Sequence, residues 1–108
     1  MNATTLTALA EPNRLRIVEY LRGNPRSVGE IALQLVIRQP QVSKHLKILS
    51  EAGWVEVRPR AQQRIYQLHR EAFDDLGMWL QTFRQYWEGN YQRLDALLAE
   101  MKEDDHET

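Results

Sequence analysis

The chain has 108 residues, of which 43% are hydrophobic and 27% charged, a composition that fits one folded domain and excludes an intrinsically disordered chain. It contains no cysteine, which excludes disulfides, thiol catalysis and cysteine-based metal sites. Residues 1–70 carry 11 basic and 5 acidic side chains, whereas residues 71–108 carry 3 and 10. The net charge of −1 is therefore the sum of a basic half with a charge of +6 and an acidic half with a charge of −7. The first half is suited to bind a polyanion and the second half to another task.

The sequence carries no recognisable targeting or membrane signal. Its first five residues lack a basic region followed by an apolar stretch, as a signal peptide would have. The densest apolar run, residues 31–37, is far too short to cross a bilayer. We therefore expect a cytoplasmic protein with no membrane partner.

The first elements in chain order are two helices. Leu6, Leu9 and Ala10 predict a short helix that closes at Glu11, and Pro12 suits the first position of the next, where its missing N–H costs nothing. The apolar spacing predicts that the second helix buries a stripe made of Leu15, Ile17, Val18 and Leu21. Glycine and proline at positions 23 and 25 end it.

A third helix begins with a capping box. Ser27 is placed to cap the helix start while Glu30 reaches back to it, and Ile31, Ala32 and Leu35 then face inward. A tight turn leads to a fourth helix, residues 39–52. At 100° per residue, Val42, Leu46 and Leu49 lie within about 60° of one another and must form its packed face. Pro40, Lys44, Lys47 and Glu51 fall opposite, with Gln41 and Ser43 on the flanks.

The next segment reads as a two-strand ribbon rich in arginine. Residues 54–58 and 64–68 alternate in polarity and predict strands, with residues 59–63 as the turn between them. A long helical pattern then covers residues 71–101, and the last stretch, residues 102–108, is a polar tail expected to fray. The fold class predicted is mainly α with a small β-hairpin, divided into residues 1–70, a long helix packed on the same domain, and the tail.

The order helix, turn, basic helix and basic hairpin is typical of a domain that presents one helix to a DNA groove. Glutamine suits adenine, and lysine suits guanine or phosphate. The candidates for reading bases are Gln39, Gln41, Ser43 and Lys44. The candidates for phosphate contact are Arg38, His45, Lys47, Arg58, Arg60, Arg64 and Tyr66. Helix-turn-helix geometry also occurs in proteins that never touch DNA, so no single motif carries this interpretation; the order of all four does.

At these residues the chain resembles the ArsR family of winged-helix transcriptional repressors. The resemblance rests on LAEPNRLRI at 9–17, QPQVSKHLKIL at 39–49 and the Ala-Gly pair at 52–53. It implies a homodimer that binds a palindromic operator and represses transcription, and that often releases DNA when an inducer binds. By the same resemblance, residues 39–47 match the recognition helix and residues 58–66 the wing.

Two positions depart from the family pattern. Many relatives have glycine in the turn where this chain has Val36, and a β-branched residue resists positive φ, so the turn is either differently shaped or strained. Arg38 stands where a serine or similar cap is common. Metal-sensing relatives use cysteines or Asp/His/Glu sets, but here the three histidines, His45, His69 and His106, share no helical face at ligand spacing. We predict a member without metal or cofactor.

The long C-terminal pattern predicts a pairing helix. Its apolar positions step alternately by four and three residues, and such a stripe exceeds what a 70-residue winged helix can cover alone. The dimer-interface candidates are Leu6, Leu9, Phe83, Trp87, Asn90, Leu94, Leu97 and Met101. Asn90 either specifies register in the seam or lies exposed beside it. An aromatic cluster at residues 79–91 belongs to core or interface, or alternatively lines a small-molecule pocket.

Rival functions are less well supported by the sequence. An enzyme would need a nucleophile with its base, a carboxylate pair or a phosphate-cradling glycine loop, and none is present. The stronger alternative is a protein-interaction module or anti-repressor that retains the fold without DNA binding. A regulator that also senses a small organic inducer of unknown identity is a third interpretation.

Overall fold

The structure is a computed structural model that describes the backbone of residues 1–107 and the side chains of residues 1–84, 86 and 96–101. The chain divides into two units, Met1–Asp75 and Leu76–Thr108, which we describe in turn. Within the described residues, no helix combines the length and the apolar character needed to span a membrane.

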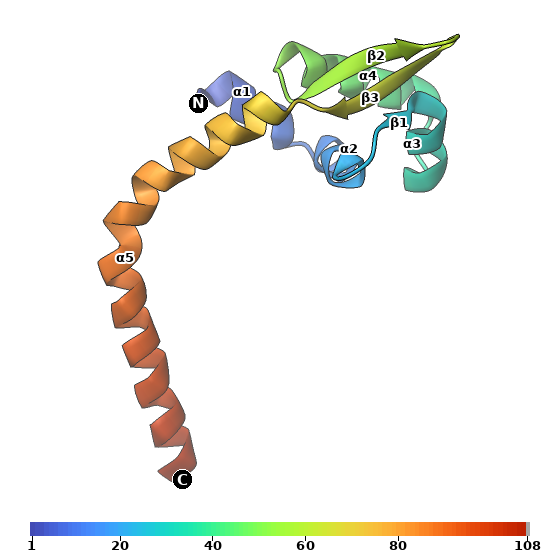
Figure 1. The fold of residues 1–108 in the computed structure, drawn as a ribbon. Coiled ribbons are helices and arrows are strands. Elements are labelled where there is room, and N and C mark those ends of the chain that lie inside the picture. Colours follow the sequence, from blue (N-terminus) through green and yellow to red (C-terminus); the bar gives the residue numbers. More distant parts are fainter. Residues whose placement is uncertain (108) are drawn as a thin grey trace. The chain divides into compact units, whose positions relative to one another are not determined.

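The first unit contains four helices, a three-stranded sheet and the start of a fifth helix (Figure 1). In chain order these elements are α1 (Ala3–Leu9), α2 (Pro12–Leu21), β1 (Arg26–Ser27), α3 (Val28–Leu35), α4 (Gln39–Glu51), β2 (Val55–Arg60), β3 (Gln63–Leu68) and α5 (Arg70–Glu107). The predicted class, mainly α with a small β-hairpin, is confirmed. Both strands of the hairpin run closer to the tip than predicted, which leaves a turn of only residues 61–62. Strand β1 was not predicted.

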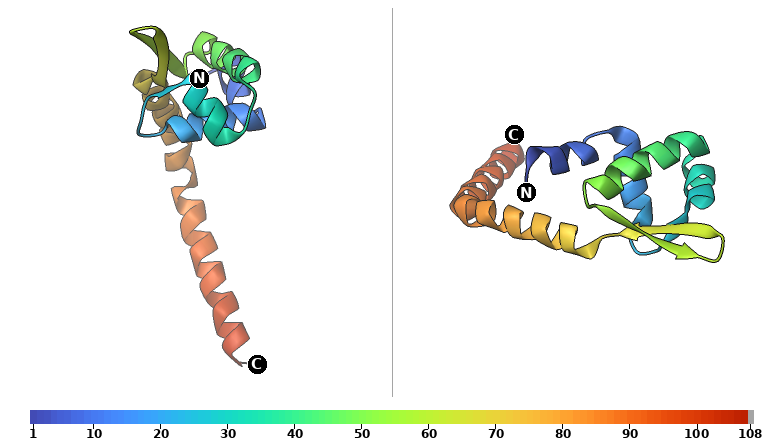
Figure 2. Two further views of the ribbon diagram at one scale, coloured as in Figure 1. Left: turned by 90° about the vertical axis from the view of Figure 1, so that its right-hand side faces the viewer. Right: turned by 90° about the horizontal axis from the view of Figure 1, so that it is seen from above.

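The sheet is antiparallel with strand order β1-β3-β2. Strands β2 and β3 pair along their whole length, from Val55 opposite Leu68 to Arg60 opposite Gln63. The two residues of β1 extend this ribbon on its other side, where Arg26 lies opposite Tyr66. Figure 2 shows the tip of the β2–β3 hairpin projecting away from the helices of this unit.

Helix starts are capped largely as the sequence predicts. The Ser27 hydroxyl accepts from the Glu30 backbone N–H at 3.2 Å, and a Glu30 carboxylate oxygen accepts from the Ser27 N–H at 3.4 Å, which confirms the capping box. The hydrogen bond from the Ser27 backbone N–H is the main reason why the pKa of the exposed Glu30 carboxyl lies below its ordinary value. Pro12 is the first residue of α2, and Glu11 caps it by accepting from the Arg14 N–H at 2.8 Å. These caps fix where α2 and α3 begin.

The core of the first unit is apolar throughout. Val42, Leu46 and Leu49 are each 0% exposed, so the predicted packed face of α4 is confirmed. Trp54, also 0% exposed, donates its indole N–H to the Thr5 carbonyl at 2.7 Å, and its ring lies 5.0 Å from that of Phe73. The remaining core residues are Ala8, Ile17, Val18, Leu21, Ile31, Ala32, Val55 and Tyr66.

The prediction that Leu15 belongs to the buried stripe of α2 is wrong. Leu15 is 44% exposed, whereas Ile17, Val18 and Leu21 are buried. At 100° per residue these three lie within about 100° of one another, and Leu15 falls about 60° outside that arc. The stripe of α2 is therefore centred between Ile17 and Val18.

In the second unit, α5 continues to Glu107. The helix therefore extends past residue 101, where the sequence predicted its end, and the fraying of the polar stretch from residue 102 stays a prediction. Large apolar side chains are exposed along the described part of this unit: Met78, Leu80, Tyr86, Leu97, Leu98 and Met101. Leu80 is 48% exposed, so it is not part of a core within one chain. The side chains of Trp87, Asn90 and Leu94, predicted for the dimer interface, lie outside the described residues.

The turn between α3 and α4 is strained at Val36. This residue caps the end of α3 with φ 57° and ψ 50° and is 90% exposed, so nothing compensates a β-branched side chain in the left-handed region. Of the two shapes left open by the sequence, the strained one occurs. We expect Val36→Gly to raise the free energy of unfolding by about 1 kcal/mol, measured by urea denaturation.

A matched control for this substitution is available one turn earlier. Leu33 is also exposed, at 84%, but lies within α3. Leu33→Gly should lower stability by about 1 kcal/mol, because glycine disfavours a helix interior. A similar loss at both positions would contradict strain at Val36.

Candidate nucleic-acid interface

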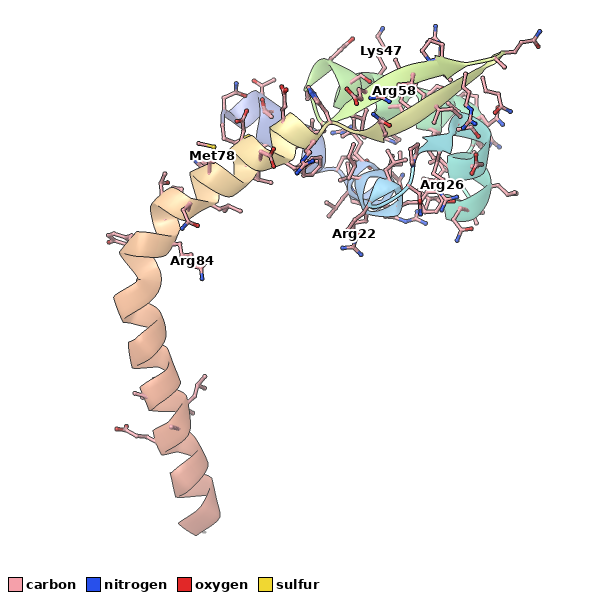
Figure 3. All side chains as sticks on the ribbon, viewed as in Figure 1. Arg22, Arg26, Lys47, Arg58, Met78 and Arg84 are labelled. Carbon is pink, nitrogen blue, oxygen red and sulfur yellow. The ribbon has the colours of Figure 1, made fainter. Side chains whose placement is uncertain are left out.

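Helix α4 presents a polar face opposite its buried one. All four base-reading candidates, Gln39, Gln41, Ser43 and Lys44, are exposed, as is Lys47. Because Val42, Leu46 and Leu49 anchor the other face, Lys44 and Lys47 are held outward, with Gln41 and Ser43 on the flanks. Gln39 lies on the first turn, on the side of α4 that faces α3. Figure 3 shows Lys47 and Arg58 on one side of the first unit and Arg22 and Arg26 on the opposite side.

The start of α4 has no side-chain cap. Arg38 takes the N-cap position with extended backbone, but its side chain makes no capping hydrogen bond. The Arg38 side chain is exposed and stands at the positive end of the helix dipole. It is therefore placed where a phosphate would meet both a guanidinium and the positive end of the helix dipole. Pro40 has no N–H, and the N–H groups of Gln41 and Val42 both bond to the Arg38 carbonyl at 3.0 Å.

A recess of about 290 Å³ lies between the start of α4 and the hairpin. Its lining residues come from the start of α3, the start of α4 and the start of β3: Ser27, Val28, Gly29, Gln39, Gln63 and Arg64. Two predicted contact residues, Gln39 and Arg64, thus meet at the same recess although they are far apart in sequence. The part played by residues 27–29 and Gln63 was not predicted, because only the pairing of β3 brings these segments together.

The arginines of the hairpin divide between its two faces. Cross-strand partners share a face, and Arg58 lies opposite Ile65 while Arg64 lies opposite Pro59. Arg58 and Arg60 therefore lie on one face and Arg64 on the other. Arg58 is 72% exposed and lies 3.9 Å from a Glu56 carboxylate oxygen, which is a weak surface pair.

Two predicted phosphate contacts are not placed for that role. Tyr66 is only 9% exposed and shares its face of the sheet with the buried Val55. The His45 side chain is 18% exposed, and its Nδ1 lies 3.7 Å from the Glu11 carboxylate with no hydrogen-bond partner. Both side chains therefore pack against the domain, and we leave them out of the contact set.

The histidines form no ligand cluster in the described part of the chain. His69 Nδ1 lies 3.2 Å from the Gly53 carbonyl, which ties the end of β3 to the turn before β2, and His45 lies beside Glu11. Among residues with described side chains, no three His, Asp or Glu gather to hold a metal ion. The side chain of His106 lies outside the described residues.

Comparison with known proteins identifies the arrangement. A family model described as a helix-turn-helix domain matches residues 9–58, which run from the end of α1 into β2. The transcriptional repressor SdpR of Bacillus subtilis is 30% identical over 76 residues, covering 70% of this chain and 84% of that protein. The solution structure of a homodimeric winged helix-turn-helix DNA-binding domain from Mycobacterium bovis, a possible ArsR-family regulator, is 28% identical with a TM-score of 0.65 over 77% of each chain. The chain belongs to the ArsR family of winged helix-turn-helix regulators.

Within the ArsR family, higher local identity is found over a shorter stretch. The HTH-type transcriptional regulator Rv2034 of Mycobacterium tuberculosis is 48% identical over 61 residues, covering 56% of this chain. The match spans 57% of the length of that regulator. In the terms used for this fold, α4 takes the position of the recognition helix and the β2–β3 hairpin that of the wing, so the predicted winged helix-turn-helix fold is confirmed.

Proposed function

We propose that this ArsR-family chain is a homodimeric transcriptional repressor that binds a palindromic operator through α4 and the wing. The observation that carries the proposal is the division of α4 into a fully buried face and an opposite face that holds the exposed Lys44 and Lys47, with the exposed Gln41 and Ser43 on its flanks. The names of its relatives support the same function, because SdpR is a transcriptional repressor and Rv2034 a transcriptional regulator.

The roles follow from chemistry and exposure. Gln39, Gln41, Ser43 and Lys44 lie on the first turns of α4, where side chains reach base edges in a major groove. The exposed cations bind phosphates and set the salt dependence of affinity. These phosphate-binding residues are Arg38, Lys47, Arg58, Arg60 and Arg64.

The dimer would form through apolar side chains of α5 and α1. Leu97 and Met101 are 53% and 56% exposed within one chain, and a second copy would cover such a surface. The proposed interface keeps the predicted set, in which Leu6, Leu9 and Phe83 are half-buried. Two-fold pairing would place the recognition helices about 34 Å apart, one turn of DNA.

The first test is fluorescence anisotropy with the DNA upstream of the chain's own gene and a scrambled duplex, each at two salt concentrations. We expect tight binding to the upstream duplex that weakens steeply with salt, because counterions return to phosphates that the cations had neutralised. Equal and feeble binding to both duplexes would contradict an operator in this DNA.

The dimer is tested with Leu97→Glu. A carboxylate in an apolar seam must be desolvated, so we expect the variant to sediment as a monomer at micromolar concentrations and to lose operator affinity. Glu100→Gln, an exposed position on the same helix, removes a charge without adding one and should remain dimeric. A dimeric Leu97→Glu protein would remove residue 97 from the interface.

The alternative function is a protein-interaction module or anti-repressor without DNA binding. The apolar contacts of such a module would include Leu33 and Val36 at the end of α3, which are 84% and 90% exposed. The relatives are named as regulators, and we propose neither an enzymatic activity nor a metal cofactor for this chain.

A further inference from the structure

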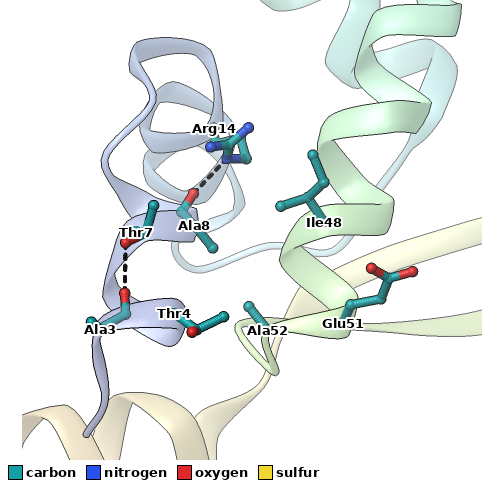
Figure 4. A pocket seen from close by; sticks show the side chains of 8 residues that line it. All are labelled: Ala3, Thr4, Thr7, Ala8, Arg14, Ile48, Glu51 and Ala52. Carbon is teal, nitrogen blue, oxygen red and sulfur yellow. Dashed lines mark hydrogen bonds between the residues drawn. The ribbon is translucent and has the colours of Figure 1, made fainter.

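An open recess of about 440 Å³ lies between α1, the start of α2 and the end of α4 (Figure 4). This volume is within the range of sites for small molecules. Four residues of α1, Arg14 of α2, and three residues at the end of α4 form its walls. The recess belongs wholly to the first unit and lies at the opposite end of α4 from the base-reading residues.

The recess contains one oriented cation. Arg14 donates its Nε–H to the Ala8 carbonyl at 2.6 Å, and its backbone N–H is held by Glu11 at 2.8 Å. No carboxylate oxygen lies within 4.0 Å of the guanidinium among the side chains that the structure describes. The two terminal nitrogens keep the fork that binds a carboxylate, and the Nε bond fixes its direction in advance.

The remaining walls set the size and charge of a ligand. Ala3, Ala52 and Thr4 are small, and Ile48 offers an apolar surface 40% exposed to solvent. A short apolar body can therefore pack beside the guanidinium. Glu51 also lines the recess with an exposed carboxylate, which disfavours a ligand carrying two negative charges. One carboxylate with an apolar body fits these walls best.

Helix α1 gives the recess a link to the rest of the protein. At 100° per residue, the recess-lining residues 3, 4, 7 and 8 form one face of α1, and Leu6 and Leu9 lie on the opposite face. A ligand would thus contact the recognition helix on one wall, and on the other a helix whose far face belongs to the proposed dimer interface.

We propose that this recess binds a small organic monocarboxylate with a short apolar body. The carboxylate pairs end-on with the Arg14 guanidinium, and the body packs on Ile48 and the alanines. Its regulatory role rests on the proposed function, because a ligand that shifts α4 alters operator affinity by the same factor by which DNA alters ligand affinity.

Ligand binding is measured first without DNA, by titration calorimetry and protein NMR with aliphatic monocarboxylates of about four to six carbons at up to about 10 mM, in parallel with their uncharged amides. We expect the acids to bind and the amides to bind at least about 10-fold more weakly, because hydrogen bonds between charged groups are the stronger ones. A series of aliphatic amino acids shows whether attraction between an added ammonium group and the Glu51 carboxylate raises the binding affinity.

Two variants and one control locate the site. Arg14→Gln should weaken acid binding about 10-fold, and Thr4→Leu should abolish it by filling the recess without touching the guanidinium. Arg22→Gln removes an equal charge from an exposed position outside the recess and should bind as the native chain does. Absence of binding by every acid, or equal binding by the Arg14, Thr4 and Arg22 variants, would overturn the proposal.

Operator anisotropy with and without a bound acid separates this proposal from the proposed function. If acids bind through Arg14 but the chain binds no DNA, the DNA-binding function fails and the site stands. If the chain binds its operator and no acid binds, the site fails and the repressor stands.

Discussion

Replacing Lys44 and Lys47 together by alanine is expected to weaken operator binding about 100-fold, since each exposed lysine contributes a charge-assisted contact to phosphate or base. Neither residue packs in the core, so the fold should be retained. The salt dependence should also change, with the slope of log affinity against log salt falling by about two. Anisotropy titrations at several salt concentrations measure both effects.

The matched control removes the same charge elsewhere. Arg22 lies on the other side of the first unit from Lys47 (Figure 3), and Arg84 lies on α5; both are exposed. The double variant Arg22→Ala, Arg84→Ala should bind the operator within about threefold of the native chain, because neither residue belongs to the proposed contact set and exposed charges without a direct contact are screened by salt. Equal weakening by both double variants would mean attraction by net charge alone. No effect in either would favour a protein partner.

Trp54→Ala is expected to lower the free energy of unfolding by about 3–5 kcal/mol, the range for deleting a buried large aromatic side chain. The side chain is fully buried, donates to the Thr5 carbonyl and packs on Phe73, so it joins the wing to α1 and to the first turn of α5. Such a loss is a large share of the stability of a small domain. Urea denaturation followed by circular dichroism measures it.

A graded variant keeps this prediction testable if Trp54→Ala does not fold. Trp54→Phe retains a ring but removes the indole donor, which leaves the Thr5 carbonyl without it, and should cost about 1–3 kcal/mol. Val57→Ala, at a position 41% exposed on β2, should cost less than either. If Trp54→Phe were as stable as the native chain, the hydrogen bond to α1 would not contribute to stability.

The helical parts of the fold could be predicted because their signals are local. The spacing of Val42, Leu46 and Leu49 sets the buried face of α4, and the Ser27 and Glu30 pair sets the start of α3. Strand β1 has only two residues, too few for alternation, and it exists only because Arg26 and Ser27 pair with β3. No local pattern could have predicted a strand defined by its partner.

The exposure of the candidate site residues could be predicted where it follows the helical period and could not where it follows packing between elements. His45 was predicted as a phosphate contact, although at 100° per residue it lies about 60° from Val42 and 40° from Leu49, on the packed side. The helical spacing alone therefore indicated that His45 lies on the packed side of α4. Tyr66 is different, because its burial depends on the register that places it opposite Val57, and register is set by the whole ribbon.

The split of the arginines across the ribbon makes the wing sensitive to the number of residues in each strand. One residue inserted between Val57 and Arg58 would carry Arg58 and Arg60 to the face of Tyr66, since side chains alternate along a strand. Two inserted residues would restore the faces, and changes confined to residues 61–62 would leave them unaltered. Natural or engineered wings of different length should therefore differ by even numbers within each strand, and length variation should concentrate at the tip.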